Sequence, residues 1–572
     1  MRVLAVLPLA MQALLLGSVG LGVGALLLSA FGYLPSLGGT GLGLGAFANV
    51  LAYPGLLPAV AATLVSGGLA TVMATCLSLA LVAAINPRGA PAVGPGARLA
   101  QRLALGLLAM PHAALALGLA FLLAPSGWVV RGLAAIFGFL RPPDYFLLND
   151  PLGCSLAVAL VIKETPFLFA VALAALKRIE VEHHLRAAIG FGYAPQLAWC
   201  KVVLPRLYPQ IRLPVLAVLA YSLSVVDMSL ILGPTAPPTL SVLVLRWIDD
   251  PDLAWRLPAA AAAVLQILLV GAAFGLWHLG EAGLGCWLRP WLSAGGRDWP
   301  PAAKRVGRLG LWLGAGLPAL LGTMAVLGMA LWSIAEVWRF PSVLPQGYSG
   351  AAWSRAAMGL AGPLRQSLGL AGAATLVALL AAVGCLEFEA RRVGAAAGRR
   401  VQWMLYLPLL TPEVGFLFGL QVLLAFADLA GTAAAVLWFH LLFVFPYVFL
   451  TLSEPWRALD DRYQRTARCL GVGPWRVLLR VKVPMLKGPI LNAAALGFAV
   501  SLSLYMPTVL AGAGRITTLA TEAIAVSAGG DRRMIGVYAV LQAALAWIGF
   551  CLALVLSRPR PFPRLETSPV AG

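Results

Sequence analysis

Charged residues are scarce in this sequence. Only 11% of the 572 residues are Asp, Glu, Lys or Arg, and 60% are hydrophobic. Soluble domains are about 25% charged and about 45–50% apolar. Because so few polar side chains cannot cover a water-exposed surface, the composition excludes an ordinary soluble domain and predicts a membrane protein.

The sequence also lacks the motifs of most catalytic and metal-binding proteins. It has no CxxC pair, and no His stands at metal-ligand spacing from a Cys, so no metal site is expected. The absence of HExxH and of a nucleophile elbow argues against a membrane enzyme. No GxxxxGK phosphate loop occurs, so we expect no cofactor in this chain, and any ATP and Mg²⁺ must be bound by a partner.

Most of the few charges that are present are basic, which gives a net charge of +19. A basic protein can bind nucleic acid, but here the basic clusters lie between long apolar runs. That arrangement is typical of cytoplasmic loops under the positive-inside rule. We therefore expect membrane lipid, and no nucleic acid, as a partner.

Twelve apolar stretches are long enough to cross a membrane. The first is longer than a signal-peptide core, so we expect an uncleaved helix there. The stretches are Ala10–Phe31, Pro58–Ile85, Leu103–Ala124, Leu152–Leu176, Ile211–Leu232, Leu257–Leu279, Leu309–Ile334, Leu364–Leu386, Val401–Ala427, Ala430–Leu452, Ile490–Leu510 and Met534–Leu556. Twelve spans put both termini on one side, and with that side cytoplasmic it carries about three quarters of the Lys and Arg residues.

One loop pattern occurs twice. RAAIGFGYAPQLAWCKVVLP (186–205) and RTARCLGVGPWRVLLRVKVP (465–484) each place a Pro three and thirteen residues after a Gly. Gly192 and Gly471 permit the positive φ that ends a helix, and Pro195 and Pro474 suit the start of the next one. Each copy therefore predicts two short helices joined by a glycine turn, with the second helix stopped by Pro205 or Pro484.

The repeat extends along the chain. Ser222-Leu223-Ser224 matches Ser501-Leu502-Ser503 at the offset of the two glycines (471 − 192 = 279), whereas Pro111 and Gly118 match Pro412 and Gly419 at a larger offset (412 − 111 = 301). The difference locates extra residues in the first half, near Trp128 to Asp150. We expect these residues to form a half-helix at the outer surface.

The duplicated loop resembles the EAA loop of binding-protein-dependent ABC permeases. The pattern is matched by Ala187, Ala188, Gly192, Val202, Leu204 and Pro205, and by Ala467, Gly471, Val481 and Pro484. The family Glu is replaced by Arg186 and Arg465, and Thr466 stands for the first Ala. The residues assigned to ATPase coupling through the resemblance, with the two turn prolines, are Arg186, Ala187, Ala188, Gly192, Pro195, Leu204, Pro205, Arg465, Ala467, Gly471, Pro474 and Pro484.

The resemblance implies an all-α polytopic membrane protein with two six-helix permease domains of the type I importer (MetI-like) fold in one chain. The first domain is expected over 1–285 (core 60–280, EAA loop 178–206) and the second over 309–572 (core 365–557, EAA loop 455–487), with a cytoplasmic linker at 286–308. The implied partners are a homodimeric ABC ATPase and a periplasmic binding protein, at a bacterial inner membrane. Fused halves of this kind are similar to thiamine and ferric-iron permeases. A secondary transporter with twelve helices remains the alternative from another class.

Among the ionisable residues within or at the edge of the predicted spans, four are candidates for the substrate path: Lys163, Glu164, Asp227 and Glu413. Each costs about 2.5–3.5 kcal/mol near the middle of a membrane, so we expect them to face the bundle interior or water. Their net charge of −2 and the aromatic Phe167, Tyr221 and Tyr505 suit a cationic organic substrate such as thiamine. The alternative is that Lys163 pairs with an acid for structural reasons, while Asp227 and Glu413 lie at wet helix ends.

Overall fold

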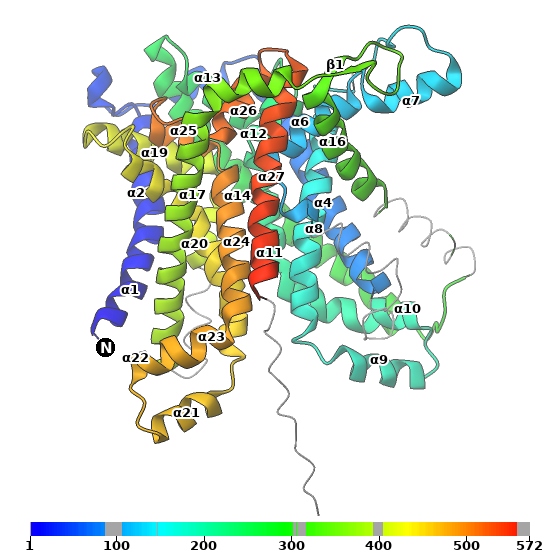
Figure 1. Ribbon diagram of the computed structural model, residues 1–572, viewed down its shortest axis with the longest axis vertical. Helices are drawn as coiled ribbons and strands as arrows, with labels where there is room; N and C mark the ends of the chain where they lie inside the picture. The colour runs from blue at the N-terminus through cyan, green and yellow to red at the C-terminus, as the bar shows by residue number, and fades with distance from the viewer. Residues whose placement is uncertain are drawn as a thin grey trace, which may run out of the picture.

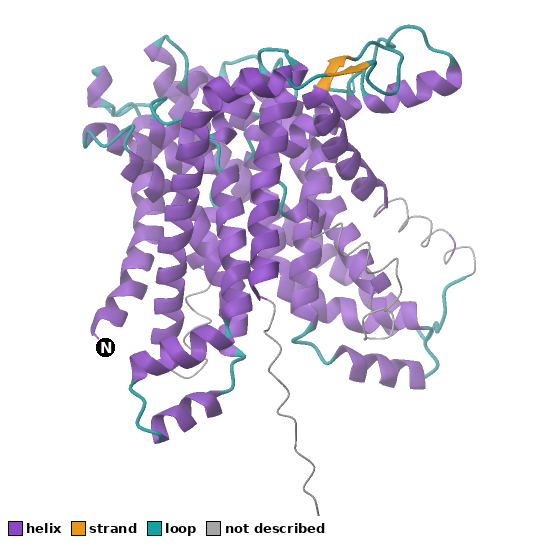
Figure 2. Ribbon diagram, in the orientation of Figure 1, coloured by secondary structure: helices purple, strands orange, loops and turns teal. Residues whose placement is uncertain are grey.

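The structure is a computed structural model that describes residues 2–85, 106–145, 147–300, 305, 316–392 and 404–557, with the side chains of 2–5 and 392 excepted. Helices make up most of this part of the chain, and its two strands form one small hairpin (Figure 2). The starts of the third, seventh and ninth predicted spans, part of the 286–308 linker and residues 558–572 lie outside the described residues.

The first half contains long helices with shorter ones between them. Its elements are α1 (Arg2–Gln12), η1 (Ala13–Gly17), α2 (Ser18–Ala30), η2 (Pro35–Leu37), α3 (Gly45–Leu51), α4 (Leu56–Ile85), α6 (His112–Leu123), α7 (Trp128–Phe137), α8 (Cys154–Leu176), α9 (Val181–Gly190), α10 (Pro195–Ala198), η3 (Trp199–Val203), α11 (Leu204–Ser224), α12 (Asp227–Leu232), α13 (Leu240–Ile248), η4 (Leu253–Trp255) and α14 (Arg256–Ser293).

The second half follows a similar order. Its elements are α16 (Leu317–Ile334), β1 (Ala335–Val337), β2 (Gly347–Tyr348), α17 (Ala351–Arg392), α19 (Glu413–Phe426), α20 (Ala433–Arg457), α21 (Asp461–Cys469), α22 (Pro474–Val477), η6 (Leu478–Lys482), α23 (Val483–Met485), α24 (Lys487–Ser503), α25 (Met506–Gly512), α26 (Leu519–Ser527) and α27 (Arg532–Ser557).

The predicted fold class is confirmed. Within the described ranges, ten helices are long and apolar enough to cross a membrane, or up to twelve if each of two bent helix pairs is one span. The helices form one bundle, with α9, α10, α21 and α22 at one end and α7, α13 and α26 at the other (Figure 1). The N-terminus lies toward the end that carries α21 and α22 (Figure 1).

Two predicted spans, Ile211–Leu232 and Ile490–Leu510, are not single helices as expected. In each half the chain leaves the helix after the second Ser of the Ser-Leu-Ser motif and then starts a new short helix. The break frees backbone carbonyls, which need donors because an unpaired buried carbonyl is costly. The side-chain amide of Gln266 donates to the Leu223 carbonyl (2.6 Å), and that of Gln542 donates to the Leu502 carbonyl (3.2 Å).

The ninth predicted span, Val401–Ala427, is also broken. Its described part consists of a helix over Met404–Leu410 and of α19, which meet at an angle of 97°. Pro412 explains the break, because proline lacks an N–H group and disfavours helical geometry in the residue before it. Glu413 therefore occupies the first turn of a new helix.

The first long helix of each half packs against the other half. In α2, Gly22 touches α19 so closely that a Cβ on Gly419 would lie 1.8 Å from the carbonyl oxygen of Gly22. In α16, Ala325 touches α6 in the same way, and a Cβ on Gly118 would lie 2.7 Å from the Ala325 carbonyl oxygen. The repeat-related glycines Gly118 and Gly419 thus lie where a helix of one half crosses a helix of the other half. We call α2 and α16, which each pack against the other half, the exchanged helices.

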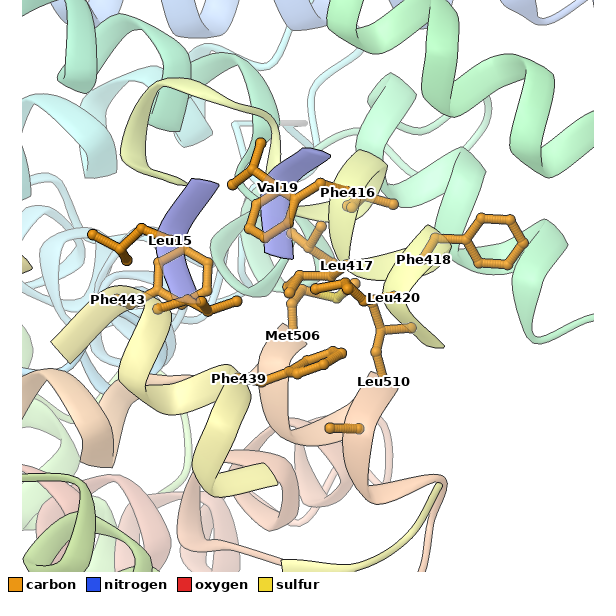
Figure 3. Close-up of a cluster of buried hydrophobic side chains, with 14 of the residues drawn as sticks. Leu15, Val19, Phe416, Leu417, Phe418, Leu420, Phe439, Phe443, Met506 and Leu510 are labelled. Atoms are coloured by element: carbon orange, nitrogen blue, oxygen red, sulfur yellow. The ribbon is translucent and has the colours of Figure 1, made fainter. Parts of the chain in front are cut away.

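The exchange creates a core that belongs to both halves. Figure 3 shows Leu15 and Val19 of the first half among buried side chains of α19, α20 and α25. Phe416, Phe439 and Met506 are each at most 2% exposed there. Lipid tails are as apolar as these side chains, so the contact between the halves is stabilised by close packing and not by removal from water.

The extra residues of the first half include α7, so a helix occurs where one was predicted. It lies at the bundle end opposite the duplicated loops, beside β1 (Figure 1). Arg131 of α7 donates to the carbonyl oxygens of Trp338 (3.2 Å), Arg339 (2.8 Å) and Ser342 (2.7 Å). The insertion is therefore fixed to the hairpin region of the second half.

Candidate functional site: the duplicated loops and the buried charges

Both duplicated loops have the predicted geometry of two helices joined by a turn. Gly192 follows α9 with a φ of 86°, and Gly471 follows α21 with a φ of 75°. Residues with a Cβ rarely adopt this conformation, which explains the glycine at both positions. Pro195 and Pro474 open the next helices, as predicted.

Pro205 does not stop the second helix, so that prediction is wrong. The helix runs from Pro195 to Ser224 and widens to a π-helical turn over Trp199–Val203 just before the proline. A π turn shifts the hydrogen-bond pattern by one residue, which accommodates the missing N–H of Pro205. The second half has the same π turn at the repeat offset (478 − 199 = 279), but its helix bends by 78° just past Pro484.

The residues that replace the family Glu lie on the surface. Arg186 is exposed and forms an ion pair with Glu182, one turn earlier in α9. Arg465 is exposed on α21. Ala188 is buried against the bundle, while Ala187 is exposed.

The first loop is covered by the chain that follows α14, residues 294–299, which we call the strap. The ammonium of Lys201 donates to the carbonyl oxygens of Ala294 (2.6 Å) and Gly296 (3.4 Å). The N–H of Ala194 donates to the carbonyl oxygen of Arg297 (2.8 Å). The strap is therefore bound to the loop by both a side chain and the backbone.

The second loop has no such cover among the described residues. A Cβ on Gly471 would meet none of them within 4 Å, whereas one on Gly192 would lie 3.4 Å from the Arg297 guanidinium. Leu470 is 78% exposed and Trp475 is 50% exposed. The two loops thus present different surfaces, although their backbones are alike.

Lys163 of the predicted path is buried in α8 and bound by backbone carbonyls. Its ammonium donates to the carbonyl oxygens of Leu108 (3.1 Å) and Met110. Within the described part of the chain it forms no ion pair with an acid, so the alternative of a structural pair is not found. Carbonyl groups just before Pro111, the residue that precedes α6, thus hold the lysine charge.

The three acids of the predicted path come from three different helices. Glu164 is buried in α8, Asp227 is buried in the first turn of α12, and Glu413 is partly buried in the first turn of α19. Asp227 interacts electrostatically with Lys163 and with Glu413. Residues of both halves therefore interact electrostatically, and we call Lys163, Glu164, Asp227 and Glu413 the charged cluster.

Three tyrosines interact electrostatically with this cluster. Tyr221 lies in the electrostatic field of all three acids, and Tyr505 lies in that of Asp227. Tyr447 interacts with Glu164 and Glu413, and its ring centroid lies 6.4 Å from that of Phe167. Phe167 and Tyr447 are related by the repeat (447 − 167 = 280), so their contact marks the approximate twofold axis between the halves.

Sequence reasoning missed Tyr447 and His112. The repeat was a signal that pointed to both, because Tyr447 matches Phe167 and His112 matches Glu413 (413 − 112 = 301). His112 packs against Tyr221 with ring centroids 5.1 Å apart.

The charged cluster is asymmetric. At the positions that match Lys163 and Glu164, the second half has Phe443 and Val444, which are buried in the shared core. Packing side chains thus replace these charges in the second half, and Glu413 is the second-half contribution to the cluster.

Two comparisons with known proteins bear on this arrangement. Residues 374–564 match the family described as binding-protein-dependent transport system inner membrane component. The chain is 31% identical over 510 residues to the inner membrane ABC transporter permease protein YnjC of Escherichia coli (strain K12), an alignment that covers 89% of this chain and 90% of that protein. This similarity extends through both halves. The chain therefore belongs to the ABC transporter permease family and is a multi-pass inner-membrane protein.

Proposed function

We propose that this chain forms the substrate path of an ATP-driven importer for an organic cation of the thiamine type. A separate homodimeric ATPase binds the two loops at the cytoplasmic side, where both chain termini also lie, and a periplasmic binding protein delivers the substrate. Closure of the ATPase dimer moves the loops, which lead into the long helices α11 and α24.

The charged cluster is the observation that carries the choice of substrate. Glu164, Asp227 and Glu413 come from both halves, and all three interact electrostatically with Tyr221. Glu164 and Glu413 also interact with Tyr447, whose ring lies near Phe167 at the approximate axis. Relative movement of the halves there opens and closes the path. Backbone carbonyls hold Lys163, so its charge is not required to pair with the acids. Carboxyl groups beside tyrosine rings offer both a counter-charge and aromatic faces to a desolvated cation.

Neutralising the acids tests the substrate class. Glu164→Gln, Asp227→Asn and Glu413→Gln should each reduce thiamine uptake by about 10-fold in vesicles that contain the ATPase and binding protein, a factor that corresponds to about 1.4 kcal/mol. The exposed loop variant Asp144→Asn is the matched control and should transport normally. Full uptake by all three variants, or transport of ferric citrate in place of thiamine, would contradict the proposal.

The two turn glycines test the coupling role. Valine at Gly192 or Gly471 must adopt a positive φ that β-branched residues avoid, so the turn is strained and ATP hydrolysis should uncouple from uptake. Gly190→Ala and Gly473→Ala are the controls, because neither has a positive φ and a new Cβ there would meet no described atom within 4 Å. Normal coupling in both valine variants would refute the docking role of the loops.

The exposed arginines predict the character of the ATPase groove. Arg186 is partly neutralised by Glu182, and Arg465 adds a positive charge to the second loop. A basic groove would place like charges opposite each other, which is unfavourable. We therefore expect the groove of the partner ATPase to be acidic or neutral where it faces these arginines, and the sequence of that ATPase tests this directly.

A further inference from the structure

A buried ion cluster connects the second loop to the long helix α17. The carboxylate of Glu387 accepts a hydrogen bond from Nε of Arg391 (2.7 Å) on one oxygen and from Nζ of Lys482 (2.7 Å) on the other. The side chains of Glu387, Lys482 and Arg391 are only 2%, 5% and 7% exposed. Lys482 closes the π turn η6 that follows α22.

The same cluster reaches the first residue of α22. Arg391 donates to the carbonyl oxygen of Pro474 (3.2 Å), and its guanidinium lies 5.6 Å from the ring centroid of Trp475. The cluster on α17 is thus connected to both ends of the segment 474–482. The ammonium of Lys482 also lies 6.0 Å from the ring centroid of Trp456 at the end of α20.

Burial makes these contacts resistant to sliding. A charge in a dry environment loses a large favourable interaction when its partner moves away, so the partners keep their relative positions. Exposed ion pairs lack this property because water replaces the partner at little cost. The segment 474–482 and the C-terminal end of α17 are therefore expected to move together.

The first half has different residues at the matching loop positions. At the repeat offset of 279, Lys482 corresponds to Val203 and Trp475 corresponds to Gln196. The first loop is instead held by the strap, through Lys201 and Ala194. The two loops are thus attached to the rest of the chain by different contacts.

We infer that Glu387, Arg391 and Lys482 form a rigid connection that transmits displacement of the second loop to α17. They are positioning residues, since they act through the loop and touch neither substrate nor nucleotide. This inference rests on the proposed docking of the loops to the ATPase. Because the matching loop position of the first half is Val203, the two halves respond unequally to one ATPase cycle.

The test is hydrogen exchange on the full transporter with its ATPase, before and after trapping with ATP and vanadate. In the wild type, exchange should change both in the loop (461–482) and at the C-terminal end of α17 (380–391). Lys482→Met removes the loop side of the cluster but leaves Glu387 paired with Arg391, so the fold should survive. The loop should still respond, and the α17 response should fall at least about twofold.

Two further variants separate a connecting role from a structural one. Lys482→Arg keeps the buried charge and should preserve the α17 response, while Arg480→Met changes an exposed cation in the same π turn and should have no effect. If the α17 response in Lys482→Met were unchanged, the proposed connection would be wrong, whether or not the unfolding temperature fell. The docking role of the loops would not be affected by that result. A wild-type loop that shows no response to trapping would refute the docking role of the loops, and this inference with it.

Discussion

The glycines at helix crossings set how closely the two halves approach. Gly419 allows α19 to touch the backbone of α2, with no space for even a methyl group. We expect Gly419→Ala to lower the free energy of unfolding by about 1–3 kcal/mol, because overpacking forces the helices apart. Thermal unfolding in detergent measures the effect. Gly372→Ala is the control: it lies exposed on α17 with free space around a Cβ, so it should be neutral or slightly stabilising.

Asp150 stabilises the start of α8. Its carboxylate accepts from the N–H groups of Cys154 (2.7 Å) and Ser155 (2.9 Å) and from the Ser155 hydroxyl (3.0 Å). Burial alone would raise the pKa of Asp150, but these hydrogen bonds together outweigh it and lower the pKa below the ordinary value. A lowered pKa means that the stabilisation is present above the unfolded pKa of about 3.9 and is lost as the pH falls through the folded value.

Replacement of Asp150 should therefore have a pH-dependent cost. At pH 7, Asp150→Ala should destabilise the protein by about 1 kcal/mol, the usual cost of losing a helix cap. The difference from wild type should shrink below about pH 4, as the wild-type carboxylate takes up its proton. Unfolding temperatures across this range provide the measurement, with the exposed Asp144→Ala as the control. A difference that grows on acidification would contradict the assignment.

At the scale of elements, the strap distinguishes the first loop from the second. Lys201 is the side chain that holds residues 294 and 296 against the loop, so Lys201→Ala should release the strap. Trypsin cleavage after Arg297 should then become about 10-fold faster, which corresponds to about 1.4 kcal/mol of lost local stability. Arg206→Ala, an exposed change near the start of α11, is the control and should leave cleavage unchanged. Equal cleavage rates in the Lys201 variant and the wild type would show that the strap is held by other contacts.

At the scale of the whole molecule, the exchanged helices join the halves independently of the linker. The α2–α19 and α16–α6 contacts bury side chains of both halves in shared cores. Two co-expressed polypeptides, 1–302 and 303–572, should therefore assemble in the membrane, and a tag on one should recover the other. Gly419→Leu should greatly reduce recovery, because its side chain has no space beside Gly22. Independent purification of the two wild-type pieces would contradict the exchange.

Some features of this protein follow from the sequence because their causes are local. Low charge and long apolar runs determine a helical membrane protein, since a helix satisfies its own backbone hydrogen bonds in lipid. The turns at Gly192 and Gly471 are equally local, because only glycine adopts that backbone conformation freely. Repetition of the loop at a fixed offset then relates the two halves without any knowledge of their contacts.

Other features were decided only by the tertiary structure, because they depend on which surfaces meet across hundreds of residues. Nothing near Gly22 in the sequence indicates that it lies against Gly419, or that Gln266 supplies a donor to Leu223 and so permits the break after Ser224. The continuation of the helix through Pro205 depends on a π turn, which local proline rules do not predict. From the sequence alone, Glu164, Asp227 and Glu413 are recognisable as costly residues in a membrane. Whether they act on one another depends on the tertiary structure, because each lies on a different helix and the packing of the halves sets their separation.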